Sequence, residues 1–241
     1  MSVVFLIDTS GSMGAPVDFD LSISIAKGPI DELAKGPIDE LNSALIKVKE
    51  DILCDSVLAN RLEIGIVAFD DEGRIERPID LISAESSFPV LTAGGLTNLV
   101  SGMNIAMSMI EERRDFYKSN YELYRRPMII LITDGAPTNT EDEINALDAE
   151  IQSKSDNKKF SFIPFGMDGA DLQLLAKLAT QTAEERLKGR GTAYLIRDVS
   201  KFNEVFALII NRVFSNTNIG GTASASLNPD VAQPMTFDYS A

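Results

Sequence analysis

The sequence contains no histidine. This absence removes Ser-His-Asp and Cys-His catalysis, imidazole ligands for a metal ion, and histidine as a general base. An enzyme built on this chain would have to rely on carboxylates, lysine, tyrosine or a bound metal.

Cysteine and long apolar runs are also scarce. The single cysteine, Cys54, cannot form an internal disulfide, which favours a reducing compartment. No basic segment precedes the first apolar run, and no stretch of about 18 apolar residues follows it. We therefore expect a cytoplasmic protein without a membrane-spanning segment.

Basic residues are few relative to acidic ones. Lys and Arg total 22 against 36 Asp and Glu, which gives a net charge of −14. Nucleic acids and anionic membranes attract basic surfaces, so we expect neither as a partner. This charge is compatible with protein partners or cations.

The first strong pattern lies at residues 3–13. Five apolar residues at 3–7 predict a short strand buried on both faces. Asp8, Ser10 and Ser12 follow it at alternate positions. Ligand sites of open α/β sheets lie beyond the carboxyl ends of the strands. One carboxylate and two hydroxyls suit a hard cation such as Mg²⁺ better than zinc.

Two further oxygen-bearing residues stand at comparable places. Thr97 follows a Gly-Gly pair just before a helical pattern, and Asp134 ends the buried strand predicted over 128–133. Taken singly, each has a structural explanation, since Ser10 and Ser12 are typical of turn caps and Asp134 begins an ordinary turn dipeptide. The occurrence of all five at three different predicted strand–helix junctions favours a common site.

Together these residues resemble the metal-ion-dependent adhesion site (MIDAS) of von Willebrand factor A (VWA) domains. The resemblance implies that Ser10 and Ser12 bind the cation directly and that Thr97 does so directly or through water. It implies that Asp8 and Asp134 hold coordinated waters. The implied ion is Mg²⁺, with Mn²⁺ or Ca²⁺ as alternatives, and an acidic residue of a protein partner completes its coordination. VWA domains of this kind are interaction modules, so we expect no enzyme.

Within this family the chain is most similar to the bacterial TerY-like group, which is associated with tellurite resistance, other stress responses and phage defence. The stretches at 6–13, 62–69 and 131–138 carry this similarity. It implies a kinase or phosphatase of the same gene cluster as a partner. The oligomeric state is not specified by any motif.

The rest of the chain predicts an α/β fold, because strands alternate with helices. We expect a doubly wound, mostly parallel sheet with one antiparallel edge strand and helices on both faces, forming a VWA domain over residues 1–214. Residues 215–241 lack a sustained period and predict a flexible tail or a segment that is ordered only by a partner. The predicted elements are strands at 61–69, 74–82, 128–133, 160–165 and 193–196, and helices at 37–52, 98–118, 168–180 and 202–214, with one more from Thr140.

An eight-residue segment occurs twice in tandem, at 26–33 and 34–41. We expect the long helix to begin at Pro37, since proline favours a first helical position. Residues from about 14 to 41 then contain an insertion relative to VWA domains. It is either a duplication tolerated in a surface loop or a segment that covers or extends the metal-binding face. A third possibility is register exchange, in which either copy of the repeat occupies the same place.

Two alternatives remain open. Asp8 after the first strand and the later Thr133-Asp134 pair also resemble haloacid-dehalogenase phosphatases, which use an Asp nucleophile and Mg²⁺. Those enzymes have a second Asp where this chain has Ser10, which disfavours this alternative. The other alternative is a structural VWA module whose metal site is blocked by the insertion.

Overall fold

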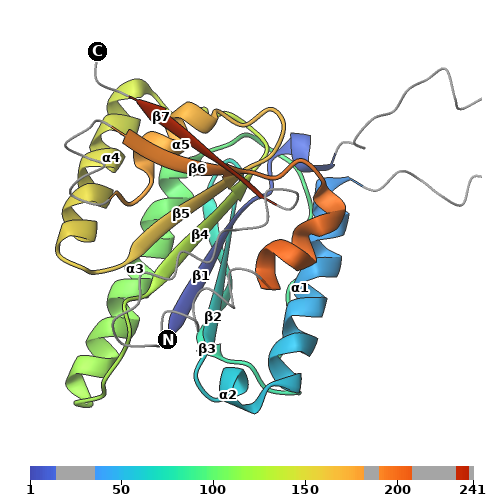
Figure 1. Ribbon diagram of the computed structural model, residues 1–241, viewed down its shortest axis with the longest axis vertical. Helices are drawn as coiled ribbons and strands as arrows, with labels where there is room; N and C mark the ends of the chain where they lie inside the picture. Colours follow the sequence, from blue (N-terminus) through green and yellow to red (C-terminus); the bar gives the residue numbers. More distant parts are fainter. Residues whose placement is uncertain (15–35, 182–189, 208–231, 239–241) are drawn as a thin grey trace, which may run out of the picture.

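The computed structural model describes residues 1–14, 36–181, 190–207 and 232–238 (Figure 1). The strands are β1 (Ser2–Asp8), β2 (Glu63–Phe69), β3 (Gly73–Leu81), β4 (Met128–Thr133), β5 (Ser161–Gly166), β6 (Arg190–Leu195) and β7 (Gln233–Asp238). The helices are α1 (Pro37–Cys54), α2 (Ser56–Ala59), α3 (Leu99–Ser119), α4 (Glu141–Asp156) and α5 (Leu172–Leu178), with short 3₁₀ turns η1 (Gly11–Gly14) and η2 (Val199–Lys201). Residues 202–207 are also helical.

The strands form one sheet in the order β3-β2-β1-β4-β5-β6-β7. The inner strands β2, β1, β4, β5 and β6 run parallel, while β3 and β7 are antiparallel edges. Parallel neighbours bring their carboxyl ends to the same edge of the sheet, so the loops after β1 and β4 meet there. The predicted doubly wound α/β fold is confirmed.

Alternate residues of β1 enter two separate hydrophobic cores. Val3, Phe5 and Ile7 pack with α1 and the helix at 202–207 on one face. Val4 and Leu6 pack with α3, α4 and α5 on the other face (Figure 1). Burial on both sides explains why this strand is a continuous apolar run rather than an alternating one.

The predicted start of the long helix is confirmed at Pro37. Gly36 precedes it in an extended conformation, and its backbone N–H donates to the Asp39 carboxylate at 3.2 Å. The helix from Thr140 also begins as predicted, with a reciprocal capping box between Thr140 and Glu143. The first copy of the repeat and most of the expected insertion lie outside the described residues.

The C-terminal prediction needs a correction, because residues 233–238 form β7 rather than a flexible tail. β7 pairs with β6 in antiparallel register and adds a second antiparallel edge to the sheet. Pairing with an open sheet edge satisfies backbone hydrogen bonds without requiring an apolar run. The neighbouring Ala232 is fully buried, and Phe237 packs on the core that contains α3. Residues 208–231 and 239–241 lie outside the described part.

None of the helices in the described ranges has the length and apolar character needed to cross a membrane.

Candidate metal site

The five predicted site residues lie at the carboxyl edge of the parallel sheet. Asp8 is the last residue of β1, and Ser10 and Ser12 belong to the loop and turn that follow. Asp134 directly follows β4, the neighbour of β1, and Thr97 lies two residues before α3. The structure therefore brings residues of three chain segments to the same edge of the sheet.

Hydrogen bonds connect these residues to one another. The Ser12 hydroxyl donates to Asp134 Oδ1 at 2.6 Å and lies 3.2 Å from the Ser10 hydroxyl. The Ser10 backbone N–H donates to Asp8 Oδ1 at 2.8 Å. These contacts fix the two serine side chains between the two carboxylates.

Gly135 shows that Thr97 belongs to the same group. A Cβ atom built on Gly135 would lie 3.4 Å from Thr97 Oγ1, 3.9 Å from Ser12 Oγ and 4.0 Å from Asp8 Oδ2. Oxygens of three segments thus surround one small space, which glycine leaves open. Thr97 is 7% exposed, so its hydroxyl faces this space from a buried position.

Both carboxylates are held in surroundings that disfavour their charge. Burial raises the pKa of Asp8 above its ordinary value, against hydrogen bonds from Thr133 and Ser10 that lower it, and the negative charge of Asp134 raises it further. Burial also raises the pKa of Asp134, against the hydrogen bond from Ser12. Among the described residues, the hydrogen bonds to these two carboxylates come from hydroxyls and amides, with no lysine or arginine. A bound cation would supply the missing positive charge.

The donor set fits a hard divalent cation. Hydroxyl and carboxylate oxygens are the ligand types of Mg²⁺, which keeps several waters when protein ligands are few. In the described ranges, no three His, Cys, Asp or Glu side chains are grouped as a metal site. The candidate site depends on the hydroxyls of Ser10, Ser12 and Thr97 for that reason, and its residues fit the ion that the sequence resemblance implies.

Sequence reasoning did not assign Thr133 to the metal site. Its hydroxyl donates to Asp8 Oδ2 from the last residue of β4. A threonine directly before the expected Asp134 is the only local signal for this role. The register of β1 and β4, which aligns Ile7 with Ile132, decides that the two side chains meet.

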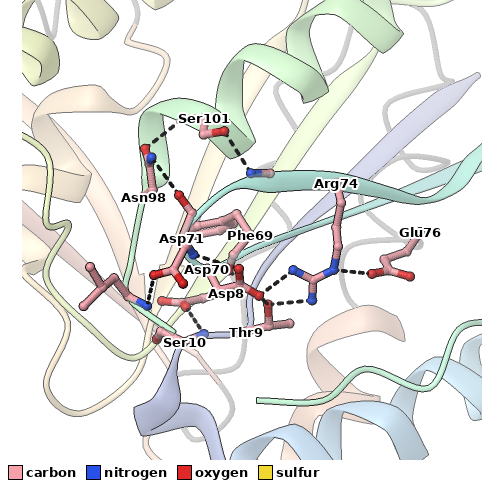
Figure 2. Close-up of polar contacts among 12 residues, drawn as sticks. Asp8, Thr9, Ser10, Phe69, Asp70, Asp71, Arg74, Glu76, Asn98 and Ser101 are labelled. Atoms are coloured by element: carbon pink, nitrogen blue, oxygen red, sulfur yellow. Dashed lines mark hydrogen bonds and ion pairs between the residues drawn. The ribbon is translucent and has the colours of Figure 1, made fainter. Parts of the chain in front are cut away.

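A second group of polar residues adjoins the site (Figure 2). Asp70 and Asp71 follow β2, and Arg74 donates to the Asp70 and Glu76 carboxylates and to the Thr9 hydroxyl. Sequence reasoning did not predict these contacts, because Thr9 lies in a loop that is distant in the sequence.

The fold and the site define a class of protein: a doubly wound α/β domain with hydroxyl and carboxylate oxygens gathered at the carboxyl edge of its sheet. The sequence profile of the von Willebrand factor type A domain matches residues 3–136, and the chain belongs to this family. VWA domains are generally protein-interaction modules. A comparison with curated proteins found no match.

Solved structures share the fold at low sequence identity. A von Willebrand factor type A protein from Catenulispora acidiphila is 20% identical, with a TM-score of 0.56 over 87% of this chain and 41% of that one. The PilB minor pilin from Streptococcus sanguinis is 12% identical, with a TM-score of 0.56 over 91% of this chain and 63% of the pilin. The ArnB paralog VWA2 from Sulfolobus acidocaldarius is 19% identical, with a TM-score of 0.51 over 85% and 43%. This chain therefore spans less than two thirds of each of these proteins.

Proposed function

We propose that this protein is a metal-dependent protein-interaction module. Ser10, Ser12 and Thr97 would hold Mg²⁺ through their hydroxyls, and Asp8 and Asp134 would orient these hydroxyls and the coordinated waters. The observation that carries the proposal is the convergence of these oxygens around the space beside Gly135. When bound, the ion supplies a Lewis-acidic centre for an incoming oxygen ligand.

The chemistry of the site favours a carboxylate on the partner. Hydroxyls and water neutralise little of the ion's charge, so an anionic oxygen gains more here than at a site built mainly of acids. Asp8 is fully buried, whereas Ser12 is exposed at the surface. A partner would therefore approach on the side of Ser12. We infer an acidic side chain, aspartate or glutamate, as the group that completes the coordination.

The biological setting follows from the TerY-like resemblance of the stretches at 6–13, 62–69 and 131–138. We propose a cytoplasmic role in a bacterial stress-response, tellurite-resistance or defence system. The proposed partner is a kinase or phosphatase encoded in the same gene cluster.

Calorimetric titration of Mn²⁺ and Mg²⁺ into EDTA-stripped protein tests the metal site. We expect one ion per chain and a 10- to 100-fold weaker affinity in Ser12→Ala and Asp134→Asn, the range typical of lost groups around a metal. Ser43→Ala and Asp115→Asn are matched controls, because both residues are exposed on helices and make only local contacts. A wild-type protein that binds neither ion would contradict the proposal.

Two further measurements separate the interaction role from the alternatives. Cell proteins retained by the wild type in Mg²⁺ should be released by EDTA and absent from Ser12→Ala. Turnover of an aryl phosphate in Mg²⁺, lost in Asp8→Asn, would favour the phosphatase alternative instead, and we expect no such turnover.

A further inference from the structure

The turn between β2 and β3 contacts both loops that carry the candidate metal ligands. Its residues Asp70 and Asp71 lie beside the loop after β1 and beside the segment that leads into α3 (Figure 2). We propose that Asp71 is a positioning residue that sets the place of Thr97 in the metal site. This inference rests on the proposed metal-binding function.

The residues on both sides of Thr97 are bound to this turn. The backbone N–H of Leu96 donates to Asp71 Oδ1 at 2.9 Å. The backbone N–H of Asn98 donates to the carbonyl of Asp70 at 2.8 Å, and its side-chain amide donates to the carbonyl of Asp71 at 3.0 Å. Thr97 is therefore held on each side, and Asp71 supplies the only side-chain acceptor among these contacts.

The same turn is fixed to the first metal-binding loop. Thr9, which lies between Asp8 and Ser10, donates its hydroxyl toward Asp70 Oδ2 at 3.2 Å, and its backbone N–H donates to the carbonyl of Phe69 at 2.8 Å. Arg74 bridges Asp70 and the Thr9 hydroxyl. Burial acts to raise the pKa of Asp70, but hydrogen bonds led by the one that Arg74 donates outweigh it and hold this pKa below its ordinary value. Asp70 therefore stays charged and anchors the turn.

Gly94 and Gly95, which precede Thr97, contact both the first metal-binding loop and the turn that contains Asp71. Gly95 has φ of +77°, and a Cβ there would lie 3.1 Å from the Asp71 carboxylate, so glycine permits both the backbone conformation and the close approach. Gly95 accepts a hydrogen bond from the Gly11 N–H at 3.1 Å, and the Gly94 N–H donates to the Thr9 carbonyl at 2.8 Å. Loss of the Asp71 acceptor would release this segment on the side that faces Thr97.

The contacts of Asp71 also argue against a role as a metal ligand. Its Oδ1 accepts from Leu96, and the carboxylate lies against Gly95 on the side of the turn. If Asp71 acts by positioning Thr97, metal affinity should depend on the hydrogen bond that Asp71 accepts from Leu96 and not on the negative charge of Asp71. That difference allows a direct test.

The test is calorimetric titration of Mn²⁺ into full-length protein, with thermal unfolding in EDTA measured in parallel. We expect Asp71→Ala to bind Mn²⁺ about 10-fold more weakly, because it removes the acceptor for Leu96. Asp71→Asn keeps an oxygen at this position and should lose less than about 3-fold. Glu72→Gln removes a charge from an exposed neighbour in the same turn and should bind Mn²⁺ as tightly as wild type.

The outcomes distinguish the positioning role from the proposed function. A wild-type protein without Mn²⁺ affinity overturns the proposed function and this inference with it. Wild-type affinity in Asp71→Ala overturns the positioning role alone. Equal losses in Asp71→Asn and Glu72→Gln would assign the effect to charge and also overturn it. Weak binding in Asp71→Ala that is rescued in Asp71→Asn, with similar melting temperatures in EDTA, supports the proposal.

Discussion

Replacement of Gly135 by alanine should separate metal binding from folding. The new methyl group would lie 3.4 Å from Thr97 Oγ1, 3.9 Å from Ser12 Oγ and 4.0 Å from Asp8 Oδ2. These are ordinary van der Waals distances, and Gly135 is not among the residues with positive φ. The substitution therefore needs no backbone rearrangement, yet it fills the space that the surrounding oxygens leave open.

The two expected effects have opposite signs. Alanine restricts the unfolded chain more than glycine, which stabilises a protein by about 0.4–1 kcal/mol when the native conformation is compatible. A methyl group among the site oxygens excludes coordinated water, and we expect metal affinity to fall about 10- to 100-fold. At about 1.4 kcal/mol per factor of ten, this loss corresponds to about 1.4–2.8 kcal/mol of binding free energy.

The assay combines Mn²⁺ titration with thermal unfolding of the metal-free protein. Gly94→Ala is the matched control, because a Cβ on Gly94 meets no atom within 4 Å and this residue lies in the neighbouring loop. We expect Gly94→Ala to bind Mn²⁺ like the wild type and Gly135→Ala to melt no lower than the wild type. Unchanged Mn²⁺ affinity in Gly135→Ala would refute the assignment of this space to the metal site.

Three predictions concern stability away from the site. Arg113→Met leaves the Glu63 carboxylate, 5% exposed, without its ion partner, and should lower the free energy of unfolding by about 3 kcal/mol in urea titrations at pH 7. A loss below about 1 kcal/mol would show that the remaining hydrogen bonds from Ser2 and Tyr117 suffice to stabilise the charge of Glu63. Burial acts to raise the pKa of Glu63, but hydrogen bonds led by the one from Arg113 outweigh it and hold this pKa below its ordinary value of 4.5. The stabilisation by the Glu63–Arg113 pair is therefore present above pH 4.5 and is lost as the pH falls through the folded-state pKa of Glu63. Denaturant midpoints of wild type and Arg113→Met should therefore converge at acidic pH, and a constant gap would contradict this pKa. Gly102→Ala places a Cβ 2.7 Å from Phe69 Cβ and should cost about 1–3 kcal/mol, whereas a neutral effect would mean that α3 shifts freely on the sheet.

Much of the fold could be predicted because local patterns and global packing agree. The apolar runs at β1 and β4 are long enough only for strands, and both are buried on two faces. Pro37 and the Thr140–Glu143 capping box set helix starts through local backbone chemistry. β7 could not be found in this way, because its stability comes from pairing with β6 rather than from its own composition.

The candidate site likewise has features that local sequence patterns predict and features that depend on tertiary contacts. The sequence by itself determined that Asp8, Ser10, Ser12, Thr97 and Asp134 stand at strand ends or helix starts, since these positions follow from local hydrophobic patterns. Only the tertiary structure decided that Thr133 meets Asp8, and that an acidic turn contacts the backbone beside Thr97. Such contacts depend on strand order and register, which are fixed by the packing of the whole sheet. No single stretch of residues therefore predicts them.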